Sequence, residues 1–415
     1  MISATLFINL TLGGIGLLAI FSAANFLVVD VLKVQAATQA KTVYALYVAG
    51  VTIFFLMLNQ VFNSILQGLH RFDVYAKIYN LNNISLILGN LALALNGFGL
   101  LPLLIWNLLV TALSALISAI SAKRLLPEFT FNLKFRRETL KLVFSYSSGV
   151  IAYQILANIL LLFERGWITG KLGAESLTFY VVPMMLALYI HSFIASLMLV
   201  IFPLASELKN EKEKLLRLYQ KATKIVCFMV VFLGATLIVE SKPFLTLWMG
   251  AEFAEKSAPL LILHTITFSL LAIEIVAWQT TEGLGYPNYN CYLFMICFII
   301  SVSGMIWLIK DYGNFGVALA RTAGFGALFL SIFYVEKRFL GRIQVKFWLR
   351  LFAILAVSTV PAVLIESFLT SRLGISWFTL IVSGAAGGFT YCLSAWLLGF
   401  VSEDEIALVK GILNR

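Results

Sequence analysis

Charged residues are scarce in this sequence. Asp, Glu, Lys and Arg make up 12% of its 415 residues, whereas hydrophobic residues make up 61%. A soluble globular domain contains about 25% charged residues, so this composition excludes a soluble protein. The sequence also lacks a Walker motif for nucleotide phosphates and a cluster of His, Cys and carboxylate residues with metal-ligand spacing. We therefore expect neither ATP hydrolysis by this chain nor a metal or other cofactor.

Cysteines and long polar loops are also few. The four cysteines, Cys227, Cys291, Cys297 and Cys392, lie in apolar segments without CxxC spacing, which is typical of small buried hydrophobic side chains. No long loop is visible where a membrane-embedded glycosyltransferase, polymerase or ligase would keep its active site, so we do not expect an enzyme. The first apolar segment has no basic residues before it, which argues against a cleavable signal peptide.

What the sequence has instead is long apolar runs. A membrane-spanning helix needs about 20 mainly apolar residues, and twelve segments meet this requirement. We therefore predict an all-α fold, a polytopic transmembrane helical bundle of about twelve spans. The predicted spans are 5–29, 43–66, 76–97, 100–122, 143–168, 178–204, 222–245, 259–281, 289–309, 315–335, 348–369 and 376–400.

The basic residues are distributed unevenly between the two sides of these spans. If the N-terminus is placed inside, the inner loops and tail carry 21 Lys and Arg residues and the outer loops carry 7. Short cytoplasmic loops are enriched in Lys and Arg, so this bias predicts that both termini lie in the cytoplasm. It also accounts for the net charge of +10 without a nucleic-acid partner.

The fifth predicted span carries polar side chains along one face. Ser147, Gln154, Asn158 and Arg165 lie within roughly 40° of one another at about 100° per residue on a helix. A polar stripe on an otherwise apolar helix favours a wet cavity over lipid as its surroundings. We therefore interpret Gln154, Asn158 and Arg165 as candidate substrate-binding residues.

Four of the charged residues inside predicted spans are candidates for function: Glu164, Arg165, Glu274 and Arg321. Charges at membrane depth are costly and face a cavity or a partner. A guanidinium presents a planar fork suited to phosphate or carboxylate, so Arg165 and Arg321 together would suit an anionic, pyrophosphate-bearing substrate. In the alternative interpretation, Glu164 or Glu274 neutralises an arginine and holds helices together.

Histidines and amides within spans admit two interpretations each. His191 and His264 could relay protons or form hydrogen bonds that support packing. Asn59 and Asn63 share one face of the second span, where amides could bind sugar hydroxyls or a neighbouring helix. The further substrate-binding candidates are Asn59 and Asn63, and the ion-coupling candidates are Glu164, Glu274 and His191.

A short internal repeat follows the second and eighth spans. Both turns, at 67–75 and 282–289, contain a Gly-Leu pair followed by tyrosine. Many transporters are built from repeats, with the substrate site at the interface of two halves. The repeat is compatible with two divisions of the first ten to twelve spans, four plus six or six plus six.

Several segments together resemble the bacterial polysaccharide flippases, the O-antigen and exopolysaccharide exporters of the multidrug/oligosaccharidyl-lipid/polysaccharide superfamily. Segment 163–173 (FERGWITGKLG), followed by 180–183 (YVVP), resembles the start of the second lobe in that family. The other similar segments are 202–206 (FPLAS), 247–253 (LWMGAEF) and 283–288 (GLGYPN).

This resemblance implies two pseudo-symmetric lobes around a central cavity and alternating access without ATP. It divides the chain into a partial N-terminal lobe (1–122), a basic cytoplasmic linker (123–141), a C-terminal lobe (142–335), and two extra helices with a short tail (336–415). It further implies a polyprenyl-pyrophosphate-linked oligosaccharide as substrate, contact with membrane lipids, and a polysaccharide polymerase and glycosyltransferases of the same pathway as partners.

Two features depart from the family pattern. Glu164 stands where the family usually has an aspartate, which retains the charge. The second lobe begins at the fifth span, so the first four spans match family helices three to six and the first two family helices are expected to be absent. This second departure leaves a partial chain with a scaffolding role as one alternative function.

We expect a flippase in the plasma (inner) membrane, and two further rival functions remain. A drug or cation antiporter of the same superfamily would have an acidic cavity, whereas the four candidate charges are two arginines and two glutamates. A membrane-embedded polysaccharide polymerase or ligase belongs to a different class and would need a long outward loop with catalytic residues.

Overall fold

The computed structural model describes residues 2–31, 36–127 and 137–401, and every regular element within these ranges is helical. This confirms the all-α class. The chain divides into two compact units, 1–145 and 146–415, which we describe separately. The helices of the first unit are α1 (Ile2–Phe26), the π-helical segment η1 (Leu27–Val31), α2 (Ala36–Gly68), α3 (Phe72–Leu95) and α4 (Leu100–Leu125).

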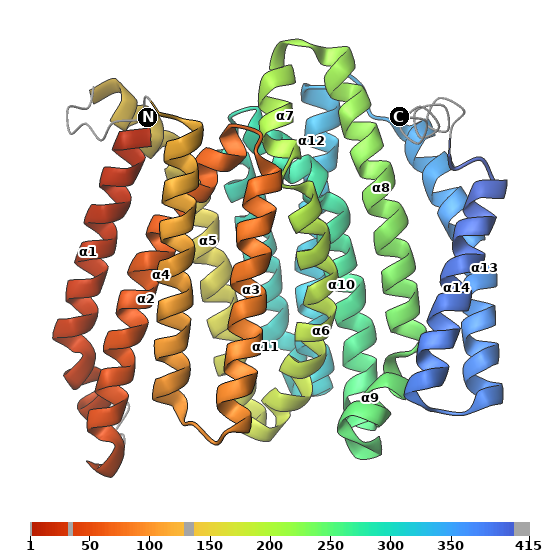
Figure 1. Cartoon of the computed structure of the whole chain (residues 1–415). Coiled ribbons are helices and arrows are strands. Elements are labelled where there is room, and N and C mark those ends of the chain that lie inside the picture. Colours follow the sequence, from red (N-terminus) through yellow and green to blue (C-terminus); the bar gives the residue numbers. More distant parts are fainter. Residues whose placement is uncertain (1, 32–35, 128–136, 402–415) are drawn as a thin grey trace. The chain divides into compact units, whose positions relative to one another are not determined.

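The second unit holds most of α5 and all later helices (Figure 1). They are α5 (Arg137–Leu172), α6 (Ala174–Met198), α7 (Ile201–Glu207), η2 (Leu208–Asn210), α8 (Lys212–Val239), α9 (Ser241–Met249), α10 (Ala251–Gly283), α11 (Pro287–Gly326), η3 (Ala327–Phe329), α12 (Leu330–Arg338), α13 (Val345–Leu373) and α14 (Trp377–Leu397).

Eleven stretches of the described residues are long and apolar enough to cross a membrane. One of them, Pro287–Arg338, is 52 residues long and contains two of the predicted spans. The chain reverses inside α11 at Gly313, whose φ of 53° and ψ of −135° are accessible to glycine at low cost. The two arms then pack closely, because a Cβ on Gly304 would lie 2.8 Å from the Cβ of Ala320. The chain therefore makes about twelve crossings, as predicted.

The predicted linker between the lobes falls partly outside the described residues. α4 continues to Leu125 and α5 begins at Arg137, whereas residues 128–136 are not described. The two units divide at Ser145 and Tyr146, inside α5. The predicted boundary after residue 335 separates two parts of what is here a single unit, and the tail beyond Val401 lies outside the description.

In the first unit, α2 packs against both α1 and α4. The buried face of α4 consists of small residues, which allows close approach of helices in a membrane. Two of them, Ser114 and Ser118, hydrogen-bond across to α2. Asn59 Nδ2 donates to Ser114 Oγ at 3.1 Å, and Ser118 Oγ donates to Asn63 Oδ1 at 3.1 Å.

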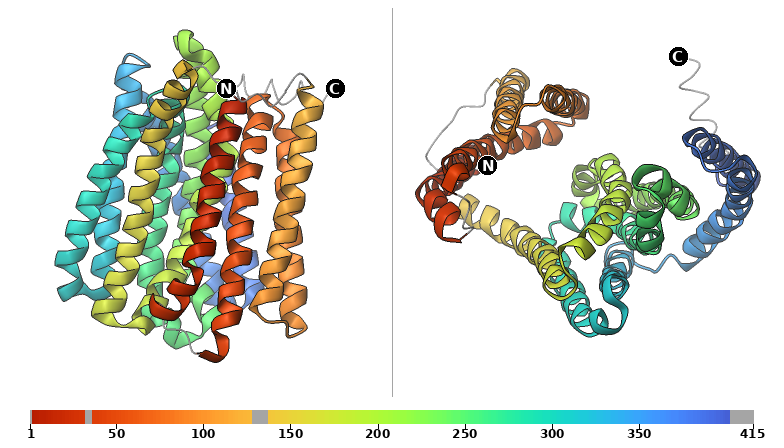
Figure 2. Two further views of the ribbon diagram at one scale, coloured as in Figure 1. Left: turned by 90° about the vertical axis from the view of Figure 1, so that its left-hand side faces the viewer. Right: turned by 90° about the horizontal axis from the view of Figure 1, so that it is seen from below.

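In the second unit, α10 is the central helix. Of its membrane-length window 72% is buried, whereas no other candidate span exceeds 33%. α10 contacts α6, α8, α9 and α11 (Figure 1). A helix that is apolar all round belongs in the interior of a bundle. α13 and α14 form an antiparallel pair that lies beside α8 and is seen in blue from below in Figure 2.

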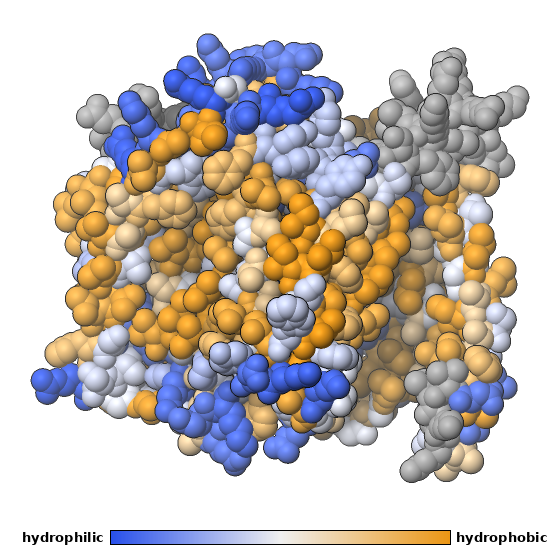
Figure 3. Space-filling view, turned by 180° about the vertical axis from the view of Figure 1, so that it is seen from behind, coloured by the Kyte–Doolittle hydropathy of each residue, from blue (hydrophilic) through white to orange (hydrophobic). Residues whose placement is uncertain are grey.

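The outer faces of the helices carry large exposed hydrophobic side chains. Examples are Leu88 on α3, Ile299 on α11 and Trp307, which is 80% exposed. Figure 3 shows that hydrophobic residues on one face form a belt between two hydrophilic margins. An exposed apolar belt of this kind is what lipid requires and water disfavours, which agrees with a multi-pass membrane protein.

Candidate functional site

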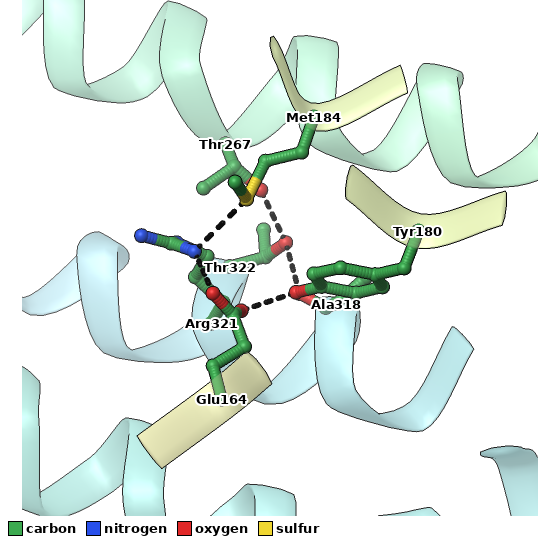
Figure 4. Close-up of polar contacts among 7 residues, drawn as sticks. All are labelled: Glu164, Tyr180, Met184, Thr267, Ala318, Arg321 and Thr322. Carbon is green, nitrogen blue, oxygen red and sulfur yellow. Dashed lines mark hydrogen bonds and ion pairs between the residues drawn. The ribbon is translucent and has the colours of Figure 1, made fainter. Parts of the chain in front are cut away.

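Three helices of the second unit bring a carboxylate, a guanidinium and a phenol together in the interior. Glu164 of α5 has no exposed surface, and Arg321 of α11 is 6% exposed. Arg321 Nη1 donates to Glu164 Oε2, and the hydroxyl of Tyr180 of α6 donates to Glu164 Oε1 (Figure 4). Each oxygen of the carboxylate therefore has a charged or polar partner, as a buried charge requires.

Local sequence explains why each of these side chains points inward. Glu164 lies between Leu160 and Ile168, at i−4 and i+4, and both of these are buried. The same spacing places Tyr180 with Met184 on the buried face of α6. Residues four apart on a helix share a face, so the polar group is carried into the interior by its apolar neighbours.

The surroundings of Arg321 are mainly apolar. Nη1 lies 3.2 Å from Met184 Sδ, and the guanidinium lies over the rings of Phe268 at 5.6 Å and Phe325 at 5.2 Å. Cations over aromatic faces gain about 0.5–2 kcal/mol, more when desolvated. Nε of Arg321 is buried and has no hydrogen-bond partner. The guanidinium is therefore held by one carboxylate and by two ring faces, and its Nε–H donor makes no hydrogen bond.

His264 of α10 lies on the other side of Tyr180. The two rings meet edge to face at 4.7 Å between centroids. His264 has no exposed surface, and neither ring nitrogen has a hydrogen-bond partner. Next to it, the hydroxyls of Thr267 and Thr322 are 2.6 Å apart and link α10 to α11. The network thus spans four helices, α5, α6, α10 and α11.

Pro183 shapes α6 one turn beyond Tyr180. Proline has no backbone N–H, so the carbonyl of Phe179, four residues earlier, loses its helical donor. The hydroxyl of Ser257 on α10 donates to this carbonyl at 3.1 Å. α10 therefore supplies the hydrogen bond that α6 lacks at Phe179, next to the buried Glu164–Arg321 pair.

The predicted polar stripe lies on a different face of α5. Gln154 and Asn158 are exposed, and Asn158 Nδ2 donates to the backbone oxygen of Gln154 at 2.8 Å. Arg165 is partly buried, and its Nε is buried without a partner. Arg165 and Arg321, which the sequence grouped as one anion site, are thus in different surroundings, because Arg321 contacts Glu164.

The remaining predicted residues are not brought into this network. Asn59 and Asn63 belong to the first unit, where both hydrogen-bond α4. His191 on α6 is partly buried with Nδ1 unpartnered. Glu274, in the middle of α10, is 1% exposed, and its Oε1 has no partner. The roles assigned to them stay predictions.

Sequence reasoning passed over four carboxylates: Glu282, which is partly buried, Glu336, which is buried, and two more that we discuss below. Glu282 accepts hydrogen bonds from the hydroxyl of Tyr153 at 2.8 Å and from Trp278 Nε1 at 2.9 Å, which ties α10 to α5. Glu336 accepts from Trp348 Nε1 and from the backbone N–H of Gln344. The available signal was their position at helix ends next to Trp and Tyr, which donate hydrogen bonds when buried.

The fold is shared with solved membrane transporters. An outward-facing multidrug resistance MATE family transporter of the MOP superfamily matches with a TM-score of 0.71, 16% identity, and coverage of 82% of this chain and 78% of its own. The lipid II flippase MurJ in an inward closed conformation matches with a TM-score of 0.63 and 15% identity, over 95% of this chain and 83% of its own. The fold class is therefore that of these transporters.

The sequence narrows this class to one family. The family described as polysaccharide biosynthesis protein matches residues 2–258, more than half of the chain, and the chain belongs to this family. A protein of Shigella flexneri whose name marks it as a proposed O-antigen transporter is 22% identical over 315 residues, 74% of this chain and 72% of its own. The polysaccharide flippase resemblance drawn from sequence is confirmed.

Proposed function

We propose that this protein flips a polyprenyl-pyrophosphate-linked oligosaccharide across the plasma (inner) membrane for surface polysaccharide biosynthesis. Membership of the polysaccharide biosynthesis family supports transport of a glycan. The name of the Shigella flexneri relative points to O-antigen as the kind of glycan. The Lys and Arg bias, 21 against 7, supports cytoplasmic termini.

The exposed polar stripe of α5 carries the proposal. Gln154 and Asn158 are exposed on a helix long and apolar enough to cross a membrane, and Arg165 follows on the same face. Exposed amides facing hydrocarbon would be costly, so this face is suited to a hydrated substrate. In the proposed mechanism Arg165 binds the pyrophosphate through its guanidinium, and the amides contact sugar hydroxyls.

The buried pair of Glu164 and Arg321 has a different proposed role. Arg321 contacts Glu164 and is closed in by Met184, Phe268 and Phe325, so it serves the transport cycle as a positioning residue that holds α11 against α5. Substrate phosphate would compete with Glu164 for the free donors of Arg321. The candidates for coupling the cycle to an ion are Glu164, Glu274 and His191.

Arg165→Ala tests the proposal in a strain that lacks its own flippase and makes a matching glycan. We expect surface polysaccharide to fall at least about tenfold, because the charge and fork that bind phosphate are gone, while the amount of protein in the membrane stays normal. Arg165→Lys should restore part of the signal, since it keeps the charge without the fork.

Lys171→Ala is the matched control, because Lys171 is a basic residue on the same helix that lies over the ring of Trp167. It should leave surface polysaccharide unchanged. Wild-type polysaccharide levels with Arg165→Ala would remove Arg165 from the site. If the unmodified chain confers drug resistance and no polysaccharide, the antiporter is the correct function instead.

Pathway partners follow from the same proposal. A lipid-linked oligosaccharide is assembled by glycosyltransferases before it is flipped, and a polysaccharide polymerase uses it afterwards. We therefore expect this transporter to act between these enzymes, in contact with membrane lipids and with its lipid-linked substrate.

A further inference from the structure

Two glutamates that the transport proposal does not use lie between α8, α13 and α14. Glu240 is the residue that follows α8, and Glu366 lies on α13; they are 5% and 1% exposed. Hydroxyl groups from each neighbouring helix donate to them. Thr236 donates to Glu366 Oε1 at 2.8 Å, and Thr370 donates to Glu240 Oε1 at 2.7 Å.

These contacts form two layers related by one helical turn. Thr236 and Glu240 are four apart on α8, and Glu366 and Thr370 are four apart on α13, so each layer pairs one carboxylate with one threonine. α14 adds Ser383, whose hydroxyl donates to Glu240 Oε1 at 2.8 Å. The arrangement gathers two carboxylates and three hydroxyls in one three-helix interface.

One oxygen of each carboxylate remains without a partner. Oε2 of Glu240 and Oε2 of Glu366 are both buried, and neither has a hydrogen-bond donor. A buried ionised carboxylate without compensation costs several kcal/mol, and two carboxylates in one interface repel each other. These two oxygens are therefore the sites where a positive charge is missing.

Basic side chains nearby do not supply that charge. Lys242, just after Glu240, pairs with Glu255 at 2.5 Å. Arg372, at the end of α13, lies over the ring of Phe368 at 5.6 Å. α14 contains no charged residue in Trp377–Leu397. Among the described residues, neither glutamate takes part in an ion pair within 4.0 Å.

The end of α8 adds to the negative potential. α8 ends at Val239, so Glu240 lies at its C-terminal, partially negative end. Cations are favoured at helix C-termini, and unwound or terminal helix segments coordinate Na⁺ in transporters. The end of α8 therefore reinforces the preference for a cation at Glu240.

A glycine gives Glu366 the room it needs. Gly387 of α14 lies directly against the carboxyl group, and a Cβ at this position would overlap Glu366 Oε1 and lie 2.6 Å from its carboxyl carbon. An alanine would push the carboxylate out of its present place. The close approach at Gly387 thus keeps Glu366 in the same interface as Glu240.

We propose that this interface is a binding site for a monovalent cation, Na⁺, held by the free carboxylate oxygens of Glu240 and Glu366 and by the hydroxyl oxygens of Thr236, Thr370 and Ser383. The small number of ligand oxygens favours Na⁺ over divalent ions. Ca²⁺ takes 6–8 oxygen ligands, and Mg²⁺ requires octahedral coordination and retains water. The ion fastens the α13–α14 pair to α8. The proposal does not depend on which substrate the protein carries.

The first measurement is equilibrium binding of radioactive ²²Na⁺ to the purified full chain in detergent. We expect about one Na⁺ per chain and a melting temperature higher by about 3 °C or more in NaCl than in equimolar KCl or N-methyl-D-glucamine chloride, because an ion that binds only the folded state stabilises it. Absence of bound ²²Na⁺ in the wild-type chain overturns the proposal.

Substitutions of the proposed ligands test where the ion binds. Glu240→Gln and Glu366→Gln should abolish Na⁺ binding and its effect on melting. Thr370→Val should weaken Na⁺ binding about tenfold, whereas Thr359→Val is a matched control on α13, because Thr359 donates to its own helix at Leu355.

Three results would contradict the assignment. Undiminished Na⁺ binding by both glutamine variants would locate the ion elsewhere in the chain. Melting temperatures that rise in every salt when either glutamate becomes glutamine would show that no cation compensates the two carboxylates. Complete displacement of ²²Na⁺ by Ca²⁺ at about equal concentration would identify a divalent site.

Discussion

Replacing Glu164 by Gln removes the only anion that the described residues place against the Arg321 guanidinium. The two side chains are 0% and 8% exposed, so water cannot compensate for the lost charge. Breaking one side of a buried ion pair costs about 3–5 kcal/mol, because the remaining charge stays buried without a partner. Arg321→Met should cost a similar amount by isolating the Glu164 carboxylate.

The double variant Glu164→Gln with Arg321→Met removes both charges. Its methionine would enter a shell that already contains Met184, Phe268 and Phe325, and replacing a whole buried pair by apolar groups is often nearly neutral. We expect the double variant to lose less than about 2 kcal/mol relative to wild type. The sum of the two single-variant losses in unfolding free energy would then exceed the loss in the double variant by about 4 kcal/mol or more.

The assay is denaturant unfolding of the four purified forms in detergent, together with surface polysaccharide in a flippase-deletion strain. If the single effects simply add in the double variant, Glu164 and Arg321 are not energetically coupled, which would refute the reasoning from their contact. A folded double variant that makes no surface polysaccharide would show that the pair serves transport. A fully active one would show that it serves packing alone.

Further predictions concern one hydrogen bond and one close packing contact. Ser257→Ala leaves the Phe179 carbonyl without a donor and should cost about 1–3 kcal/mol in denaturant unfolding; an unchanged midpoint would mean that α6 tolerates the gap. Gly89→Ala places a Cβ on the indole of Trp106 and should lower stability by about 1–3 kcal/mol. Gly14→Ala is the matched control, since its Cβ meets no atom within 4 Å, and a melting temperature equal to that of Gly89→Ala would contradict the packing argument.

The crossings of the membrane were predictable because each is a local property of the chain. In hydrocarbon every backbone N–H and C=O must be satisfied within its own helix, so length and hydropathy suffice to locate a span. The reversal inside α11 also followed from sequence, since Lys310, Asp311 and the glycine at 313 interrupt the apolar run.

Only the tertiary structure decided which polar groups meet. Glu164 and Arg321 are separated by 157 positions, and the sequence was equally compatible with an anion site made of Arg165 and Arg321. The contacts of Asn59 and Asn63 with Ser114 and Ser118 likewise depend on how α2 packs against α4, and their role in substrate binding stays a prediction.

Glu240 and Glu366 lie inside the predicted spans 222–245 and 348–369, but nothing in the sequence indicated that the two would meet. Their burial became visible only when α13 and α14 packed against α8. Hydropathy is a sum over neighbouring residues and is fixed by composition, whereas a polar contact depends on which face of one helix meets which face of another. The sequence therefore determined how often the chain crosses the membrane, and packing determined which of its charges are paired.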